Sequence, residues 1–300
     1  MTDLLWHYTD AAGLLGIVEK SQIWLTHVDF LNDSQEYRIA RDLLHEVLAE
    51  IGSDTQEQDL VRRFAQVALA RLQIHDRQDE RFPFGAYVAS FSTLDDDLSQ
   101  WRAYGRSGAK FSIGFSKESL MQWAEQLSYR FGAANYDNEL AKQELRRQFL
   151  ATQETMAKSW IGPASGFNYT DPDAIHIPSF LAEITKLIEP LRPWAKHSAF
   201  KSESEYRLVA DFRVPPSGSP VAPGVAHVLP TFRQGPGHLI PYICADIPRS
   251  LNAIREIRVG PTSDPVKALS SIQFLVDTIE RKGHCENMQV ASSKIPFRDW

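Results

Sequence analysis

The segment 196–212 changes from charged residues to alternating apolar ones. From Glu205 onward this alternation predicts a β-strand, in which successive side chains point to opposite faces. The predicted polar face, if the strand begins early enough, consists of Glu203, Glu205, Arg207 and Val209. The predicted apolar face consists of Tyr206, Leu208, Ala210 and Phe212. Two acids beside an arginine on a half-buried strand cost solvation free energy unless they pair or bind a ligand. The group is therefore either a salt bridge at the rim of the sheet or part of a site.

The order of apolar patterns predicts one α+β domain over residues 1–300. Strand-like patterns cover residues 4–8, 22–26, 86–92, 109–115, 205–212, 238–245 and 254–259. Helical periodicity dominates from about residue 117 to 195, which predicts a mostly helical insertion. The pattern also predicts a helix over residues 10–20 with Thr9 as its N-cap. We see no Pro/Gly/Ser linker that would separate two self-sufficient halves.

Composition narrows the classes of function. The chain has 32 basic and 38 acidic residues, a formal net charge of -6, so its bulk charge does not indicate nucleic acid or an anionic membrane as partner. Its two cysteines, Cys244 and Cys285, form no zinc-type pattern, and we expect neither a disulfide framework nor a metal. The N-terminus has no basic, apolar leader pattern, and no apolar run approaches about 18 residues. We therefore expect a cytoplasmic protein without a membrane span.

Familiar nucleotide and hydrolase motifs are missing from the sequence. There is no Gly-x-Gly-x-x-Gly, Walker loop, His-Glu-x-x-His or Gly-x-Ser-x-Gly. The acidic run 95–97 is interpreted as a solvated turn, because a calcium loop needs a longer series of oxygen ligands. Among nine histidines, His7 stands out because its position is at a strand end beside a predicted helix N-terminus.

Three stretches resemble domain-of-unknown-function family 2971, a mostly prokaryotic family. They are Trp6-His7-Tyr8-Thr9 with the segments 23–26 and 30–36, Ser90-Phe91-Ser92 with 100–105, and 200–207. The later segments 257–261 and 293–298 also look like that family. The resemblance spans nearly the whole chain.

The order of these signals is similar to that of ADP-ribosyltransferases, which implies a split or strongly bent, mainly antiparallel sheet. The resemblance implies that His7 holds the adenosine-side ribose of NAD, that Ser92 supports the site and that Trp101 or Tyr104 stacks on nicotinamide. It assigns Glu205 as the catalytic acid and Glu203 as a group that orients or activates the acceptor. It also places Tyr8, Thr9 and Arg207 among the cofactor-binding residues.

This assignment suits the chemistry of NAD. Cleavage of the nicotinamide–ribose bond builds oxocarbenium-like charge, which an ionised glutamate can stabilise. A second acid can take the proton of the acceptor. We therefore expect NAD as substrate, no metal, and an unknown macromolecular acceptor for an ADP-ribosyltransferase or water for an NAD glycohydrolase. We expect His7, Tyr104 and Glu205 to converge on one cleft.

Other interpretations stay open from the residues alone. Trp101 and Tyr104 lie one helical turn apart and would serve equally as core aromatics. Glu205 can pair with Arg207, Ser92 can hydrogen-bond to the backbone, and His7 can cap or pack. The alternative function is a catalytically silent nucleotide- or protein-binding module, for example in a phage-defence or toxin-related system. A further alternative keeps the enzyme class with a nucleic-acid end or a free nucleotide as substrate.

Overall fold

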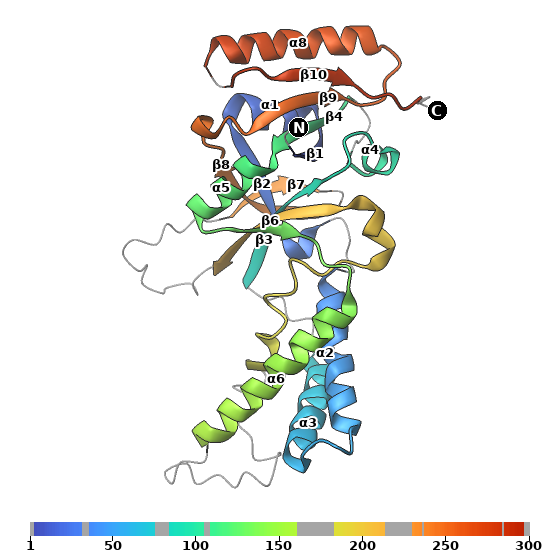
Figure 1. The fold of residues 1–300 in the computed structure, drawn as a ribbon, viewed down its shortest axis with the longest axis vertical. Coiled ribbons are helices and arrows are strands. Elements are labelled where there is room, and N and C mark those ends of the chain that lie inside the picture. The colour runs from blue at the N-terminus through green and yellow to red at the C-terminus, as the bar shows by residue number, and fades with distance from the viewer. Residues whose placement is uncertain are drawn as a thin grey trace. The chain divides into compact units, whose positions relative to one another are not determined.

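A computed structural model describes residues 3–31, 36–75, 84–104, 109–160, 183–213, 230–235, 237–283 and 285–296 (Figure 1). Its internal contacts divide the chain into two compact units. The first comprises residues 1–30, 86–134 and 199–300, and contains the sheet; the second comprises residues 31–85 and 135–198, and contains a helical core. The prediction of a single domain stays a prediction.

The first unit is built on a large, open, mostly antiparallel sheet. Its strands are β1 (Leu4–Asp10), β2 (Gln22–His27), β3 (Phe84–Ser92), β4 (Lys110–Ser116), β5 (Arg130–Ala133), β6 (Glu205–Arg213), β7 (Thr231–Gln234), β8 (Leu239–Asp246), β9 (Ile254–Val259) and β10 (Gln289–Ser292). The main order is β10-β9-β4-β1-β3-β2-β8-β7, and β6 pairs with both β3 and β5. The β10–β9 pair is parallel. The predicted mixture of helices with a mainly antiparallel sheet is confirmed, and the sheet branches at β3.

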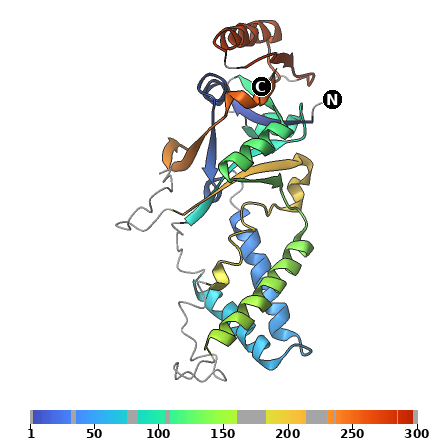
Figure 2. The ribbon, with the colours of Figure 1, turned by 60° about the vertical axis from the view of Figure 1, so that its left-hand side comes forward.

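Helices α1 (Ala11–Lys20), α5 (Lys117–Leu127) and α8 (Pro265–Arg281) pack on this sheet, as the two views show (Figures 1 and 2). Ser116 and Asp264 cap α5 and α8, each accepting a hydrogen bond from a backbone N–H of the first turn. The prediction that Thr9 caps α1 is wrong by one residue. Asp10 is the N-cap and accepts from the Gly13 N–H, because Thr9 still belongs to β1.

Strand alternation divides the sheet residues between two faces. One face forms the main core and includes Leu5, Phe91, Ile113, Leu208 and Ala210. The predicted apolar side of β6 is thus confirmed for Leu208 and Ala210, and Tyr206 packs against the same core; the side chain of Phe212 lies outside the described residues. A smaller cluster on the other face of β1 contains Trp6, Tyr8 and Trp101.

The second unit is a helical core. Its long helices are α2 (Glu36–Ser53), α3 (Asp59–His75) and α6 (Asn138–Trp160). Their apolar stripes meet in a buried cluster that includes Leu44, Leu48, Phe64, Leu145 and Phe149. The helical periodicity predicted from about residue 117 to 195 is confirmed for α5 and α6. Within the described ranges, no helix has the length and hydropathy needed to cross a bilayer.

Candidate functional site

His7 lies where β3 changes from pairing with β2 to pairing with β1. β1 pairs with β4 from Leu4↔Ser116 to Asp10↔Lys110, but its register with β3 consists of Trp6↔Ser92. β2 pairs with β3 at Tyr87 and Val88. Ser90 lies between these two paired parts. We call His7, Ser90, Phe91 and Ser92 the β1–β3 junction.

His7 is held at this junction by one hydrogen bond. Its Nδ1 lies 2.9 Å from the Ser90 carbonyl oxygen, and its ring centroid lies 5.7 Å from that of Phe91. A carbonyl can only accept, so Nδ1 carries the proton and Nε2 keeps a lone pair. Burial, with a smaller contribution from the positive charge of Arg233, lowers the pKa of His7 and outweighs the hydrogen bond to Ser90. Within the described part of the chain this is the ring's one hydrogen bond, which leaves Nε2 available as an acceptor.

Ser92 ties the end of β3 to the start of β6. Its hydroxyl donates to the Glu203 carbonyl oxygen at 2.7 Å and accepts from the Leu94 N–H at 3.0 Å. The Thr93 N–H donates to the Ser204 carbonyl oxygen at 3.2 Å. Ser92 is 3% exposed, so the interpretation that it binds backbone holds in this structure. Its position fits a supporting role at the junction.

Glu203 does not belong to the strand. It ends the 3₁₀ helix η4 (Ser198–Glu203), and Ser204, with a φ of 46°, separates that helix from β6. The condition that the strand begins early enough is therefore not met, and Glu203 does not share the strand face of Glu205. It meets the junction through its backbone carbonyl.

Glu205 and Arg207 form a buried ion pair on one face of β6. The Arg207 guanidinium donates from Nε to Oε1 at 2.8 Å and from Nη2 to Oε2 at 2.9 Å. Glu205 is 5% exposed and Arg207 is 1% exposed. Their i, i+2 spacing places both side chains on the same side of the strand, as predicted. Of the interpretations open from the sequence, pairing of Glu205 with Arg207 is the one that the structure shows.

Tyr8 and Trp101 lie on the face of β1 opposite to His7. The Tyr8 hydroxyl donates to the Leu94 carbonyl at 2.9 Å and accepts from the Asp97 N–H at 3.1 Å. Burial raises the pKa of Tyr8. Trp101 is 2% exposed and meets Tyr8 edge to face, with ring centroids 4.7 Å apart. Tyr104, at the end of α4 (Leu98–Tyr104), packs against the same cluster.

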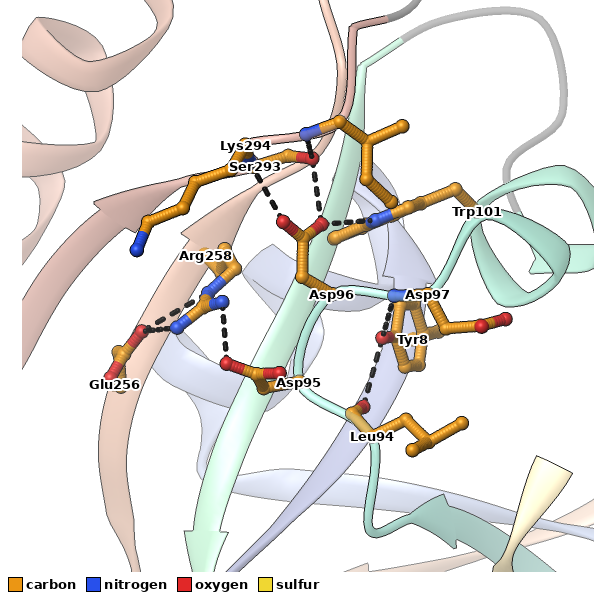
Figure 3. Close-up of polar contacts among 11 residues, drawn as sticks. Tyr8, Leu94, Asp95, Asp96, Asp97, Trp101, Glu256, Arg258, Ser293 and Lys294 are labelled. Carbon is orange, nitrogen blue, oxygen red and sulfur yellow. Dashed lines mark hydrogen bonds and ion pairs between the residues drawn. The ribbon is translucent and has the colours of Figure 1, made fainter. Parts of the chain in front are cut away.

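Asp96 joins Trp101 to a distant part of the chain (Figure 3). Its Oδ1 accepts from Trp101 Nε1 at 2.8 Å and from the Ser293 hydroxyl at 2.6 Å, and its Oδ2 accepts from the Lys294 N–H at 2.8 Å. We call Tyr8, Asp96, Trp101, Ser293 and Lys294 the Asp96 network. The run 95–97 is therefore more than the solvated turn we expected, since Asp96 and Asp97 are half-buried.

Beside this network, Arg258 is held between two acids. It donates to Asp95 at 2.7 Å and to Glu256 at 2.9 Å, and its guanidinium lies 4.9 Å from the centroid of the Trp6 ring. Desolvation by burial opposes the charged form, but the two carboxylates outweigh it and raise the pKa of Arg258. These contacts stabilise the sheet on the side of Trp6.

The predicted site residues thus fall into two groups. His7 and Ser92 lie at the junction, with Glu203, Glu205 and Arg207 at the neighbouring start of β6; Tyr8, Trp101 and Tyr104 lie with the small aromatic cluster. Alternation puts His7 on the core face of β1 with Leu5, whereas Glu205 lies on the face of β6 opposite to Leu208. Tyr104 packs on the face of β1 opposite to His7, so the strand faces do not bring His7, Tyr104 and Glu205 together in one cleft as predicted.

The Thr9 hydroxyl lies so close to Gly13 that a Cβ atom added to Gly13 would collide with it. Thr9 therefore contacts the first turn of α1. Sequence reasoning missed Ser90 and Asp96 as organising residues. Among the described residues, no group of three or more acidic, His or Cys side chains is arranged to hold a metal ion.

Comparison with known proteins identifies one family. No curated protein and no solved structure matches this chain. A model for the family described as "Protein of unknown function (DUF2971)" matches residues 100–208. The matched part includes Trp101, Glu205 and Arg207, whereas His7 and Ser92 precede it. The predicted family resemblance is therefore confirmed over residues 100–208.

Proposed function

We propose that this protein binds NAD at the β1–β3 junction and transfers or hydrolyses its ADP-ribose. The observation that carries the proposal is the fixed orientation of His7. Its Nδ1–H is bound to Ser90, so its Nε2 offers a lone pair from a ring whose pKa is lowered. Such a neutral acceptor suits a ribose hydroxyl.

β3 joins the two strands that carry the proposed groups, although alternation puts the side chains of His7 and Glu205 on opposite faces of these strands. β3 pairs with β1, which carries His7, and with β6, which carries Glu205. The resemblance to ADP-ribosyltransferases puts a ribose-binding residue and a catalytic glutamate on two such strands. For the fold, that resemblance implies a split or strongly bent, mainly antiparallel sheet. We therefore assign the ribose contact to His7 and the charge-stabilising carboxylate to Glu205.

Arg207 has a defined part in this chemistry. Its two hydrogen bonds favour the ionised form of Glu205 and orient the carboxylate. An ionised carboxylate is what the oxocarbenium-like transition state requires.

The second candidate is a nucleotide-binding module without catalysis. The burial of Glu205, which is 5% exposed, favours it. In that case the Glu205–Arg207 pair only joins neighbouring groups inside the sheet, and His7 contributes to binding alone.

Incubation of the full chain with NAD labelled in its nicotinamide separates these candidates. We expect Glu205→Gln to lower nicotinamide release by about 100-fold or more, as loss of a charge-stabilising group does elsewhere. Glu256→Gln is the matched control, because Glu256 also pairs with an arginine two residues later on a strand. Circular dichroism verifies that each variant is folded.

The outcomes are distinct. Release that Glu205→Gln leaves unchanged contradicts the catalytic assignment. Binding of NAD with no release by the wild type supports the silent module. An absence of NAD binding contradicts the NAD proposal and favours a silent module that binds another nucleotide or a protein.

A further inference from the structure

Helix α8 carries a stripe of exposed side chains on the side opposite to its buried residues. Ile272, Val276 and Ile279 are buried, and α8 packs against β9 and β10. Both views show α8 on the outer side of β10 (Figures 1 and 2). The exposed residues within about 60° of Ser270 around the helix are Val266, Lys267, Ser270, Gln273, Phe274 and Asp277. We call these six residues the α8 stripe.

The α8 stripe contains two exposed apolar residues in a symmetric arrangement. Val266 and Phe274 are 74% and 76% exposed. Each lies four positions from Ser270, which places them about 40° to either side of it around the helix. In an antiparallel pair of α8 helices with a two-fold axis through Ser270, Val266 of each copy therefore lies against Phe274 of the other. The small Ser270 side chain at the axis lets the two helices approach closely.

The charges of the stripe match under the same axis. Lys267 lies opposite Gln273 of the second copy, and Asp277 follows that Gln273 by one helical turn. Because the helices are antiparallel, this turn lies toward the N-terminus of the first α8, which is the direction in which the Lys267 side chain leans. Asp277 Oδ1 accepts from Gln273 Nε2 at 2.9 Å, which holds the carboxylate on the stripe. Each Lys267 thus meets Asp277 of the other copy, and the axis forms this pair twice.

We infer that the α8 stripe is an interface with a second copy of this chain, in which two α8 helices pack antiparallel about a two-fold axis through Ser270. The stripe is complementary to itself in both apolar contacts and charge, which an interface between identical copies requires. The helices overlap over about three turns, because α8 begins at Pro265. A contact of this length is at the low end of interface sizes, so we expect a dimer that dissociates on dilution.

Sedimentation velocity of the full chain over a concentration series measures this dimer. We expect Phe274→Ser to raise the dissociation constant about 10-fold or more, because the variant loses two buried aromatic contacts per dimer. We expect a similar effect from Ser270→Glu, which puts two like charges at the axis. Circular dichroism verifies that each variant is folded.

Each of these variants has a matched control. Phe232→Ser also removes an exposed phenylalanine, which is 59% exposed on β7. Ser271→Glu adds the same charge one residue further along α8, where the exposed side chain lies about 100° around the helix from Ser270. Both controls should dimerise as the wild type does.

A charge exchange tests the pairing of Lys267 with Asp277. We expect Lys267→Glu to raise the dissociation constant about 10-fold, since the lost attraction and the new repulsion each occur twice in the dimer. Adding Asp277→Lys should restore most of the affinity, because the opposite charges then face each other again. An effect that the second substitution does not reverse contradicts the pairing.

A cross-link tests the position of the axis. Helices that pack 8–10 Å apart, each with its Cα atoms about 2.3 Å from its axis, bring the two Ser270 Cα atoms to about 4–5 Å, which a disulfide can span. In a Cys244→Ser background, which removes the exposed native thiol, we expect Ser270→Cys to form a covalent dimer on mild oxidation. Ser271→Cys should do so much more slowly.

The outcomes are decisive for this interface and do not depend on NAD. A dimer that Ser270→Glu and Lys267→Glu weaken, and that Ser271→Glu leaves intact, supports the inference whether or not NAD is cleaved. A chain that stays monomeric at the highest soluble concentration overturns it, even if another protein binds α8. A dimer that all these variants leave unchanged also overturns it, because its interface then lies elsewhere.

Discussion

His7 and Tyr8 are neighbours on β1, yet they belong to regions of different character. In the Asp96 network, Tyr8 both donates and accepts, and Asp96 accepts three hydrogen bonds from Trp101, Ser293 and Lys294. At the β1–β3 junction, His7 uses Nδ1 and keeps the Nε2 lone pair. A network in which the hydrogen-bonding groups serve one another holds structure together. A side chain such as His7, oriented by one hydrogen bond and with a second ring nitrogen able to accept another, is suited to binding a ligand.

The largest change in stability is expected at the Glu205–Arg207 pair, which lies beside the β1–β3 junction. Arg207→Met would remove the guanidinium that donates two hydrogen bonds to the buried Glu205 carboxylate, and we expect a loss of about 3–5 kcal/mol in the free energy of unfolding. Urea denaturation followed by tryptophan fluorescence measures it. Arg130→Met is the control. Arg130 also binds a carboxylate, Asp211, through two nitrogens, but the side chains of Arg130 and Asp211 are 37% and 57% exposed.

We expect the Arg130→Met control to lose about 0–1 kcal/mol. Adding Glu205→Gln to Arg207→Met should restore part of the lost stability, because the buried charge is then removed. A loss below about 1 kcal/mol for Arg207→Met would mean that the Glu205 carboxylate does not depend on its guanidinium partner.

A smaller effect is expected from the Asp96 network. Asp96→Asn replaces one acceptor oxygen by a donor that faces another donor, and we expect a loss of about 1.5–3 kcal/mol. Thermal unfolding measures the loss, and near-ultraviolet circular dichroism reports the packing of Trp101. Asp95→Asn is the control, since the Asp95 side chain is 57% exposed and pairs with Arg258 at the surface. Equal losses in the two variants would contradict the distinction between them.

The strand β6 could be predicted from sequence because its evidence is local. Alternation from Glu205 onward fixes which side chains enter the core, and Leu208 and Ala210 are there. The pairing of Glu205 with Arg207 follows from the same spacing and was open as one of two interpretations. The start of the strand depended on Ser204, whose positive φ is not encoded by any residue preference at that position.

The Asp96 network could not be predicted, because its partners are far apart in sequence. Ser293 and Lys294 follow Asp96 by almost 200 residues. The acidic run offered a signal, but an acidic run in a turn is usually solvated. The role of Ser90 was hidden for another reason. It acts through its carbonyl oxygen, and only the change of strand partners along β3 makes that oxygen the partner of His7.

The protonation and tautomer of the His7 ring, and the response of its Nε2 to a ligand, test the central claim most directly. Nitrogen-15 NMR of the imidazole, with and without ADP-ribose, observes both ring nitrogens. We predict a neutral ring near pH 7, protonated on Nδ1, which titrates below the ordinary value of about 6.5, and an Nε2 resonance that shifts when ADP-ribose is added. A ring protonated on Nε2, or an Nε2 resonance that saturating ADP-ribose leaves unchanged, would contradict the assignment of His7 as the ribose-binding acceptor.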